Sequence, residues 1–528
     1  MTLSEQLVAL EKRITELEQD NKRVPALEQE NKRLHDTVAY LTKKLFGKSS
    51  EKTSSISEGQ MSLFDEIMIF NEAEDQANPN TEEPDLRTEA EKHCKKRYKG
   101  QRKDMLQNLE RVKKVYHLAA NDRSCDICTT ELVPVGEEFV RSELEFIPAQ
   151  IRVIDYYRET LECRTCRKDG KSHMESAITP APVILHSLAS PSTIAWVIHQ
   201  KFVNAAPLYR QENEWKTLGI TLSRATLSNW LLVVARDWLL PIVERLHQEI
   251  LKERYAHADE TPLQVLQEEG RKNTTKSYMW VYSTGQYGDH PIRLFEYQPG
   301  RAGNYPKKFL KGFKGFLHSD AYSGYDKVGD VIHCYCWAHV RRKMVDILPK
   351  DMKSPEATLP AKGIAFCNKL FEIERSLKAL TSAERKKQRL ELESPVLEAF
   401  WTWVDSSLQN VPPKSNISAA LSYARNHKTR LMNYLEDGNC SISNNLAENS
   451  IRPFTVGRKN WLFSGSPKGA VASAAIYSLV ETAKANRLNP YHYLKFILED
   501  LPGLPFRQYP EILNRYLPWN PDIQEICK

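Results

Sequence analysis

Apolar residues recur in alternating steps of three and four along the first 46 residues, with Glu, Lys and Arg between them. This spacing is typical of a coiled coil, because a heptad repeat keeps one apolar seam along the helix. Pro25 breaks the helix and shifts the repeat, which then resumes. We therefore predict a leucine-zipper helix over 1–46 that pairs two chains. A single amphipathic helix packing on its own domain is the alternative. The seam consists of Leu3, Leu7, Leu10, Ile14, Leu17, Asn21 and Val24, then Leu27, Asn31, Leu34, Val38, Leu41 and Leu45.

The stretch 47–115 has little hydrophobic periodicity and is rich in Ser, Glu, Asp, Asn and Lys. Such a composition predicts a mostly disordered linker, since it cannot bury enough apolar surface to fold. Its charge is divided, because acids dominate 72–91 and the run 92–103 is strongly basic. The basic run is suited to DNA phosphates, and a solvated tail is the equal alternative.

Two Cys-x-x-Cys pairs lie in the next segment, 116–180, on either side of residues that alternate in the manner of strands. Four thiolates suit a closed, tetrahedral, structural zinc site, which leaves no open position for catalysis. We therefore predict a small zinc-binding β module, with four ordinary buried cysteines as the alternative. The zinc ligands would be Cys125, Cys128, Cys163 and Cys166.

The segment 181–250 is predicted to be helical. One helix follows Ser190 and Pro191, and a second begins after Pro207 and ends near Gly219. A third follows after a short turn and carries polar side chains on its exposed face, an arrangement typical of a helix-turn-helix. An ordinary helical hairpin is the alternative. The residues predicted to contact DNA are Arg224, Thr226, Ser228 and Asn229.

Strand-like and helix-like patterns alternate in 251–488, which predicts a mixed α/β sheet. The helical and charged stretch 350–440 would be an insertion into this domain, and the tail 489–528 would pack back onto it. A short helical segment around Glu448 is expected to be interrupted by Pro453. Strands are predicted at 276–283, at 292–297, from Gly315 to the acid Asp320, and at 331–337. Helices are predicted at 300–310 (a crossover), 338–343 and 470–485.

Length and composition add a few limits. A chain of 528 residues is too long for one core, and a net charge of +6 indicates little by itself. No stretch has the length and apolar character of a membrane span, and the charged N-terminus does not resemble a signal peptide. We therefore expect a cytoplasmic protein without a membrane partner, whose ten cysteines are reduced.

Three acids invite a hypothesis about chemistry. Asp259, Asp320 and Glu448 would hold two divalent cations if they converged on the sheet, one cation activating a water or 3′-hydroxyl and the other stabilising the leaving oxygen. Hard oxygen ligands favour Mg²⁺ or Mn²⁺ over zinc. Spacing alone leaves convergence open, because acids so far apart occur in any large protein.

The motifs around these acids change the picture, because they resemble, in order, signatures of the IS66-family transposases. Further matches are the zipper, the double Cys-x-x-Cys, the segment 207–211, the segment 481–486 and 517–519 near the end, so the resemblance spans nearly the whole chain. The catalytic motifs are His257-Ala258-Asp259-Glu260-Thr261-Pro262, Asp320-Ala321-Tyr322-Ser323-Gly324-Tyr325, Cys336-Trp337-Ala338-His339, Asn444-Asn445-Leu446-Ala447-Glu448, Ile451-Arg452-Pro453 and Gly457-Arg458-Lys459-Asn460-Trp461.

This resemblance implies a multidomain α/β protein with an RNase H-like DDE catalytic core and an all-helical insertion. Before the core would come the coiled coil, the zinc module and the helix-turn-helix domain. Asp259, Asp320 and Glu448 would be the triad that holds two Mg²⁺ or Mn²⁺ ions, beside one structural zinc. Cys336 and His339 resemble a C-x-x-H signature, with strand-end packing around a hydrogen-bonded histidine as the alternative, and we do not expect a second zinc site there. Phosphate contacts would come from Arg452, Arg458 and Lys459.

The implied activity is cleavage at the terminal inverted repeats of an insertion element, followed by joining to target DNA. The implied setting is a bacterial nucleoid, with the protein as a homodimer or higher oligomer and with accessory proteins of the same element. Two features depart from the family pattern: Asn449 replaces the more usual Arg, and the linker is less arginine-rich. A DNA-binding protein that no longer cuts and an unrelated metal-dependent nuclease or phosphatase are the alternatives.

Overall fold

The computed structural model describes residues 151–162, 174–348 and 358–528. The predicted coiled coil at 1–46, the linker at 47–115 and the four cysteines predicted to bind zinc lie outside the described residues. A short antiparallel pair, β1 (Thr160–Glu162) and β2 (Met174–Ser176), falls within the segment predicted to form the zinc module.

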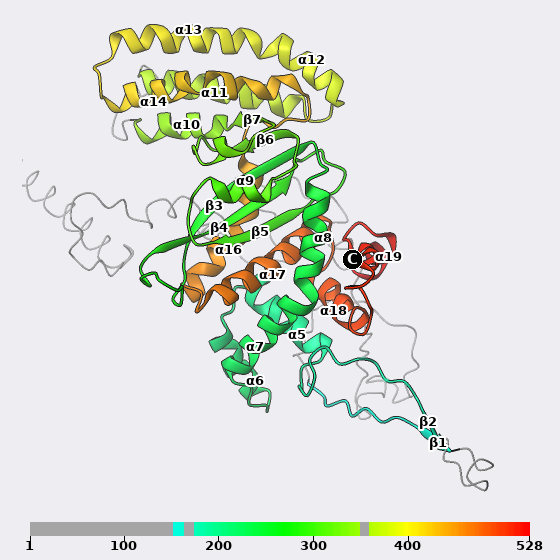
Figure 1. Ribbon diagram of the computed structural model, residues 1–528. Coiled ribbons are helices and arrows are strands. Elements are labelled where there is room, and N and C mark those ends of the chain that lie inside the picture. The colour runs from blue at the N-terminus through cyan, green and yellow to red at the C-terminus, as the bar shows by residue number, and fades with distance from the viewer. Residues whose placement is uncertain (1–150, 163–173, 349–357) are drawn as a thin grey trace, which may run out of the picture. The chain divides into compact units, whose positions relative to one another are not determined.

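A five-stranded mixed sheet forms the centre of the described chain (Figure 1). Its strand order is β5-β4-β3-β6-β7, so the first three strands form an antiparallel meander. The last two strands join the sheet parallel to β3 and to each other. The strands are β3 (Tyr255–Gln264), β4 (Lys276–Thr284), β5 (Arg293–Gln298), β6 (Gly315–Ser319) and β7 (Val331–Tyr335).

The predicted strands therefore occur, and the differences lie at the ends of elements. The predicted crossover helix at 300–310 is shorter, α9 (Asn304–Phe309), because its first turn begins only after Gly303. The strand predicted at 331–337 stops at Tyr335, since Trp337 already begins α10 (Trp337–Asp346). Cys336 is the residue that joins the two elements.

Successive residues of β3 point to opposite faces of the sheet. His257 and Thr261 contact the region of α16 (Asn445–Trp461), through a hydrogen bond from His257 Nδ1 to Asn444 and one from Arg458 to Thr261. On the same face α17 (Pro467–Ala485) packs against β5. Glu260 points to the opposite face, where its carboxylate contacts Tyr325. Asp259 thus shares a face with α16.

In the part of the chain that the structure describes, four α-helices precede the five-stranded sheet, in agreement with the helical character predicted for 181–250. Each of the first and third helices begins at a serine whose hydroxyl accepts a backbone N–H, Ser190 and Ser223. Gly219 has φ +91°, which only glycine adopts without strain, so the chain turns there between the second and third helices. The helices are α5 (Pro191–Ile198), α6 (Leu208–Thr217), α7 (Arg224–Val234) and α8 (Leu240–Ile250), with π-helical turns at His199–Val203 and Ala235–Leu239.

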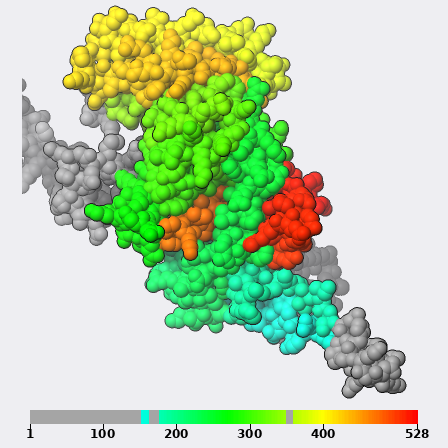
Figure 2. All heavy atoms as spheres, in the orientation of Figure 1, coloured from blue at the N-terminus to red at the C-terminus, as the bar shows by residue number. Residues whose placement is uncertain are grey.

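The stretch between β7 and α16 is helical where it is described, as predicted. Its helices gather beyond the β7 edge of the sheet (Figure 1) and form one block in the space-filling view (Figure 2). They share a second hydrophobic core with β7 and α10, distinct from the core beneath the rest of the sheet. The helices are α11 (Leu359–Ser376), α12 (Ser382–Leu392), α13 (Ser394–Asn410), α14 (Asn416–Asn426) and α15 (Lys428–Met432).

The prediction that Pro453 interrupts the helix around Glu448 is wrong. Helix α16 runs unbroken from Asn445 to Trp461 with Pro453 inside it. Proline has no backbone N–H, so the carbonyl of Asn449, four residues before Pro453, loses its helical hydrogen-bond donor. Asn449 is exposed, so a water molecule can donate to that carbonyl instead. On the opposite side of the helix, Ile451 and Phe454 are buried in the core, and this burial stabilises the helix.

The C-terminal tail packs back on the fold, as predicted. It comprises α18 (Pro490–Asp500), a 3₁₀ turn at Pro510–Tyr516 and α19 (Pro521–Ile526). Tyr493 and Leu494 are fully buried in the first core. Among the described helices, none has the length and apolar character needed to cross a membrane.

A carboxylate cluster where the parallel strands end

The register of the parallel strands places Asp259 beside Asp320. His257 of β3 is paired with His318 of β6, and each aspartate lies two residues further along its strand direction. Because side chains repeat every two residues, both aspartates fall on the face that carries the two histidines. The two imidazoles stack with ring centroids 4.3 Å apart, which shows how close the two strands hold equivalent side chains.

Asn444 brings the start of α16 to this edge of the sheet. Its side-chain amide donates to the backbone carbonyl of Ala258 at 2.9 Å, and its carbonyl oxygen contacts Nδ1 of His257 at 3.0 Å. Its backbone N–H donates to the sulfur of Cys336 at 3.1 Å. Asn444 is buried, so all these contacts are shielded from water. One helical turn later, Glu448 lies in the first turn of α16 on the same face.

Electrostatics shows that the three acids lie within range of one another. Burial raises the pKa of Asp259 well above its usual value, and repulsion from Glu260, Asp320 and Glu448 raises it further. A hydrogen bond from the Glu260 backbone N–H to Asp259 acts in the opposite direction. Carboxylates collected this closely repel one another, and Arg301 and Arg342 offset that repulsion only in part, so the cluster is suited to binding a cation.

Glu448 also faces two side chains of α10. Its Oε2 pairs with Arg342 at 3.2 Å, and its Oε1 lies 3.7 Å from Nδ1 of His339, too far for a hydrogen bond. Both Oε1 and Nδ1 are buried without a hydrogen-bond partner among the described residues. The interpretation of a hydrogen-bonded histidine is therefore wrong for Nδ1. Ligand atoms of Cys336, His339 and Glu448 lie within 4.8 Å of one another, close enough to hold an ion.

Protonation states at this edge follow from burial. Burial lowers the pKa of His339, while the charge of Glu448 acts in the opposite direction. Burial raises the pKa of Cys336 to about 12, so this thiol is neutral near pH 7. Burial lowers the pKa of His257 to about 3, which leaves its ring neutral as well. In this state the negative charge of the site comes from carboxylates alone.

Glu260 and Arg301 also belong to the cluster, although the sequence motifs assign neither of them a role. The Glu260 carboxylate is 1% exposed and accepts a hydrogen bond from Arg301 Nε at 2.6 Å and another from the Tyr325 hydroxyl. The same guanidinium lies 3.9 Å from Asp320. Burial raises the pKa of Glu260, as does Asp320, and Arg301 and Tyr325 oppose them. A second acid directly after Asp259 was the available signal in the sequence.

The three basic residues predicted to contact phosphates differ in their surroundings. Arg458 is half-buried and donates to the Thr261 hydroxyl of β3 at 3.2 Å, so it holds α16 against the sheet. Lys459 is exposed, and Arg452 is half-buried. Asn449, the departure from the family pattern, is exposed between Glu448 and Arg452.

The predicted DNA-contacting residues lie at the start of α7, away from the carboxylates in the sequence. Arg224 and Asn229 are exposed, while Thr226 and Ser228 are half-buried. The Thr226 backbone N–H donates to the Ser223 hydroxyl at 3.1 Å, and the two hydroxyls lie 2.9 Å apart. Thr226 therefore takes part in the helix cap, and Arg224 and Asn229 are the side chains presented to solvent.

Comparison with known proteins covers most of the chain. Residues 186–472 match the family model "Transposase IS66 family". Residues 122–167 match "zinc-finger binding domain of transposase IS66", and this match supports a structural zinc. Residues 33–113 match "Transposase C of IS166 homeodomain", and residues 478–519 match "IS66 C-terminal element".

Similar proteins occur in Sinorhizobium fredii. The uncharacterized protein y4hP is 26% identical over 499 residues, which is 91% of this chain and 87% of that protein. The uncharacterized protein y4jD is 27% identical over 508 residues, covering 92% of this chain and 94% of its own length. A third, y4qI, is 29% identical over 80% of this chain and 78% of its own length.

Proposed function

Because the chain belongs to the IS66 family of transposases, we propose that it cuts DNA at the terminal inverted repeats of its element and joins the ends to target DNA. In this proposal Asp259, Asp320 and Glu448 form a DDE triad that binds two Mg²⁺ or Mn²⁺ ions. The observation that carries it is the register of β3 and β6, which puts both aspartates at matching positions next to the start of α16.

The donor set fits hard divalent cations. Asp259, Asp320 and Glu448 supply only oxygen atoms, and Oε1 of Glu448 is buried without a hydrogen-bond partner among the described residues. Bound Mg²⁺ would polarise the scissile phosphate and lower the pKa of the attacking hydroxyl. The protein's own contribution is position: Asn444 orients the helix that carries Glu448, and Arg301 neutralises Glu260 behind the aspartates.

The topology supports an RNase H-like core. An antiparallel three-stranded meander followed by two parallel strands on the side of its first strand is the arrangement expected of that fold. Asp259 lies within the first strand and Asp320 directly after the fourth. The helical stretch before α16 would then be the insertion that separates Glu448 from the aspartates.

DNA recognition would be shared among the N-terminal parts. The turn between α6 and α7 would serve as a helix-turn-helix, with Arg224 and Asn229 on its exposed side. A structural zinc on Cys125, Cys128, Cys163 and Cys166 and the basic run at 92–103 would extend this contact, and the zipper over 1–46 would pair two protomers. Pairing suits a reaction that must hold both element ends, on DNA of the bacterial nucleoid and with accessory proteins of the same element.

A cleavage assay on DNA carrying an element end tests the proposal. Asp259→Asn removes a negative oxygen ligand and keeps the shape of the side chain, so a loss of roughly 10³-fold in Mg²⁺-dependent cleavage and strand transfer is expected. Asp405→Asn, an exposed acid on α13, serves as the matched control and should cut like the wild type.

Two outcomes would overturn the proposal. Equal activity of Asp259→Asn and wild type would remove the triad from the mechanism. Specific binding of the end without any Mg²⁺-dependent cut by the wild type would instead indicate a DNA-binding protein.

A further inference from the structure

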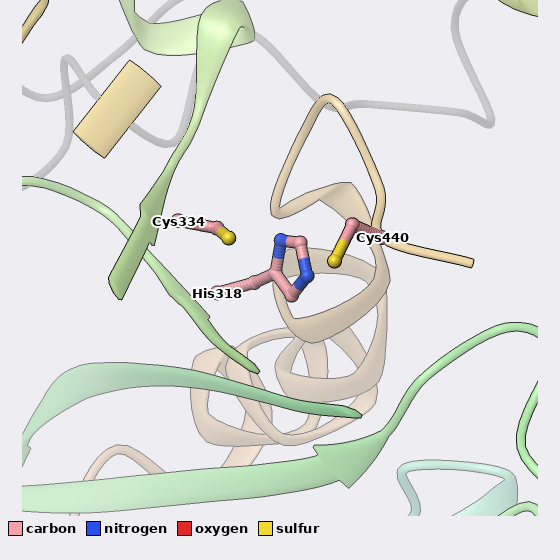
Figure 3. A group of neighbouring side chains, drawn as sticks. All are labelled: His318, Cys334 and Cys440. Atoms are coloured by element: carbon pink, nitrogen blue, oxygen red, sulfur yellow. The ribbon is translucent and has the colours of Figure 1, made fainter. Parts of the chain in front are cut away.

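A second cluster of side chains that can bind a metal lies two residues before the carboxylate positions along the parallel strands. His318 of β6 is paired in register with Cys334 of β7, and Cys440 approaches both from the segment that leads into α16. Figure 3 shows the sulfur atoms of both cysteines turned toward the imidazole ring. One nitrogen of His318 and the two sulfur atoms all lie within 4.8 Å of one another.

The cluster is sealed from solvent. His318 is 2% exposed, Cys334 1% and Cys440 0%. Nε2 of His318 has no hydrogen-bond partner among the described residues, although it is buried. Buried polar atoms are almost always paired, so an unpaired imidazole nitrogen beside two thiols calls for a partner that the chain itself does not supply.

The surrounding residues hold these ligands in place. Arg389, which is 1% exposed, donates to the backbone carbonyl of Cys440 at 2.8 Å and is itself paired with Glu374. The His318 ring also has a hydrogen bond to the backbone of Ser441. Ligating histidines commonly use one ring nitrogen for such a bond and the other for the metal.

We propose that His318, Cys334 and Cys440 bind a structural Zn²⁺ ion. Two sulfur ligands and one imidazole suit zinc and exclude Mg²⁺, which requires oxygen ligands. Binding releases the two thiol protons, so two thiolates and one Zn²⁺ form a neutral group that the buried surroundings tolerate. These three side chains supply three of the four ligands of a tetrahedral zinc, and because the site is buried, an enclosed water molecule would complete the set.

This ion would join the parts of the proposed active site. His318 lies two residues before Asp320, Cys334 two residues before Cys336, and Cys440 in the segment before Glu448. One zinc therefore connects β6, β7 and the approach to α16 directly beneath the carboxylates. The proposal concerns ligands different from the four N-terminal cysteines, and it stands whether or not the protein cuts DNA.

Zinc content of the purified full-length chain tests the site, measured by native mass spectrometry and by elemental analysis. We expect two zinc ions per chain in the wild type. One should remain in Cys440→Ser, and one in a Cys125→Ser/Cys163→Ser variant that removes the N-terminal site. Cys367→Ser, a buried cysteine of α11 outside the cluster, is the matched control and should retain both ions.

A ligand exchange keeps the test valid if a cysteine variant folds poorly. His318→Cys supplies another zinc ligand and should retain two ions, whereas His318→Ala should retain one. Circular dichroism verifies that each variant is folded. Equal zinc content in the wild type, Cys440→Ser and His318→Ala would overturn the proposal. So would a Cys334–Cys440 disulfide in protein purified under reducing conditions.

Discussion

Asp259 and Asp320 occupy matching positions on neighbouring parallel strands, each two residues beyond the stacked pair His257 and His318. Burial raises the pKa of Asp259, and repulsion from Glu260, Asp320 and Glu448 raises it further. Burial and repulsion of this carboxylate therefore cost the metal-free protein folding free energy.

Asp259→Asn should stabilise the metal-free protein near pH 7.5. The folded-state pKa of Asp259 is raised, so its ionisation destabilises the fold. This penalty is fully present above the folded-state pKa, shrinks as the pH falls below it and is gone below the unfolded-state pKa. Removing the charge should raise the melting temperature by about 2 °C, because roughly 1 kcal/mol shifts a domain of about 150–250 residues by about 2–4 °C and a larger one by less. Differential scanning fluorimetry in EDTA measures it.

The response of the melting temperature to Mg²⁺ tests the same residue with metal present. Mg²⁺ should raise the melting temperature of the wild type and have a much smaller effect on Asp259→Asn, because a ligand that binds only the folded state stabilises it. The exposed-acid variant Asp405→Asn should respond like the wild type. An equal Mg²⁺ response in Asp259→Asn would contradict a cation site at these carboxylates.

Asn444→Ala should destabilise the protein by about 2–4 kcal/mol, because it leaves the Ala258 carbonyl and Nδ1 of His257 buried without partners. Urea unfolding followed by tryptophan fluorescence measures the change. The neighbouring Asn445→Ala is the control. Because Asn445 is exposed, this substitution should lower the free energy of unfolding by less than about 0.5 kcal/mol. Similar losses in the two variants would show that Asn444 does not hold α16 to the sheet.

Arg301→Ala should destabilise the protein more at pH 8.5 than at pH 6. Arg301 opposes the burial that raises the pKa of Glu260, so its loss raises that pKa further and makes the ionised, buried carboxylate more costly as the pH rises. Because Arg301 is 41% exposed, the expected loss is modest, about 1–2 kcal/mol at the higher pH.

A double-mutant cycle isolates this pair. In a Glu260→Gln background the pH-dependent part of the Arg301→Ala effect should vanish, since no carboxylate remains to titrate. If the pH dependence persisted there, another acid, with Asp320 the nearest at 3.9 Å, would be its source.

Arg224→Ala should weaken binding to DNA that carries the element end. If Arg224 contacts a phosphate, the slope of log affinity against log salt should fall by about one, with similar losses on unrelated DNA. A loss confined to one base position would indicate a base contact instead. Arg515→Ala, an exposed arginine of the C-terminal tail, is the matched control. Unchanged binding by Arg224→Ala at all salt concentrations would remove α7 from the interface.

The sequence by itself determined the local elements with fair accuracy. The strands around 276–283 and 292–297 and the helices of 181–250 follow from hydrophobic period and capping residues, which act over a few neighbours. The ordered motifs also identified the family. Local rules failed at Pro453, where burial of Ile451 and Phe454 favours the helix although proline weakens it.

Only the tertiary structure decided which distant side chains meet. The register of β6 on β3 is a pairing of segments far apart in the chain, and no local pattern specifies it. The same pairing brings His318 beside Cys334 and Cys440, a cluster that the spacing of cysteines in the sequence does not indicate. Strand register and buried polar contacts such as those of Asn444 depend on the whole fold, and they create both clusters.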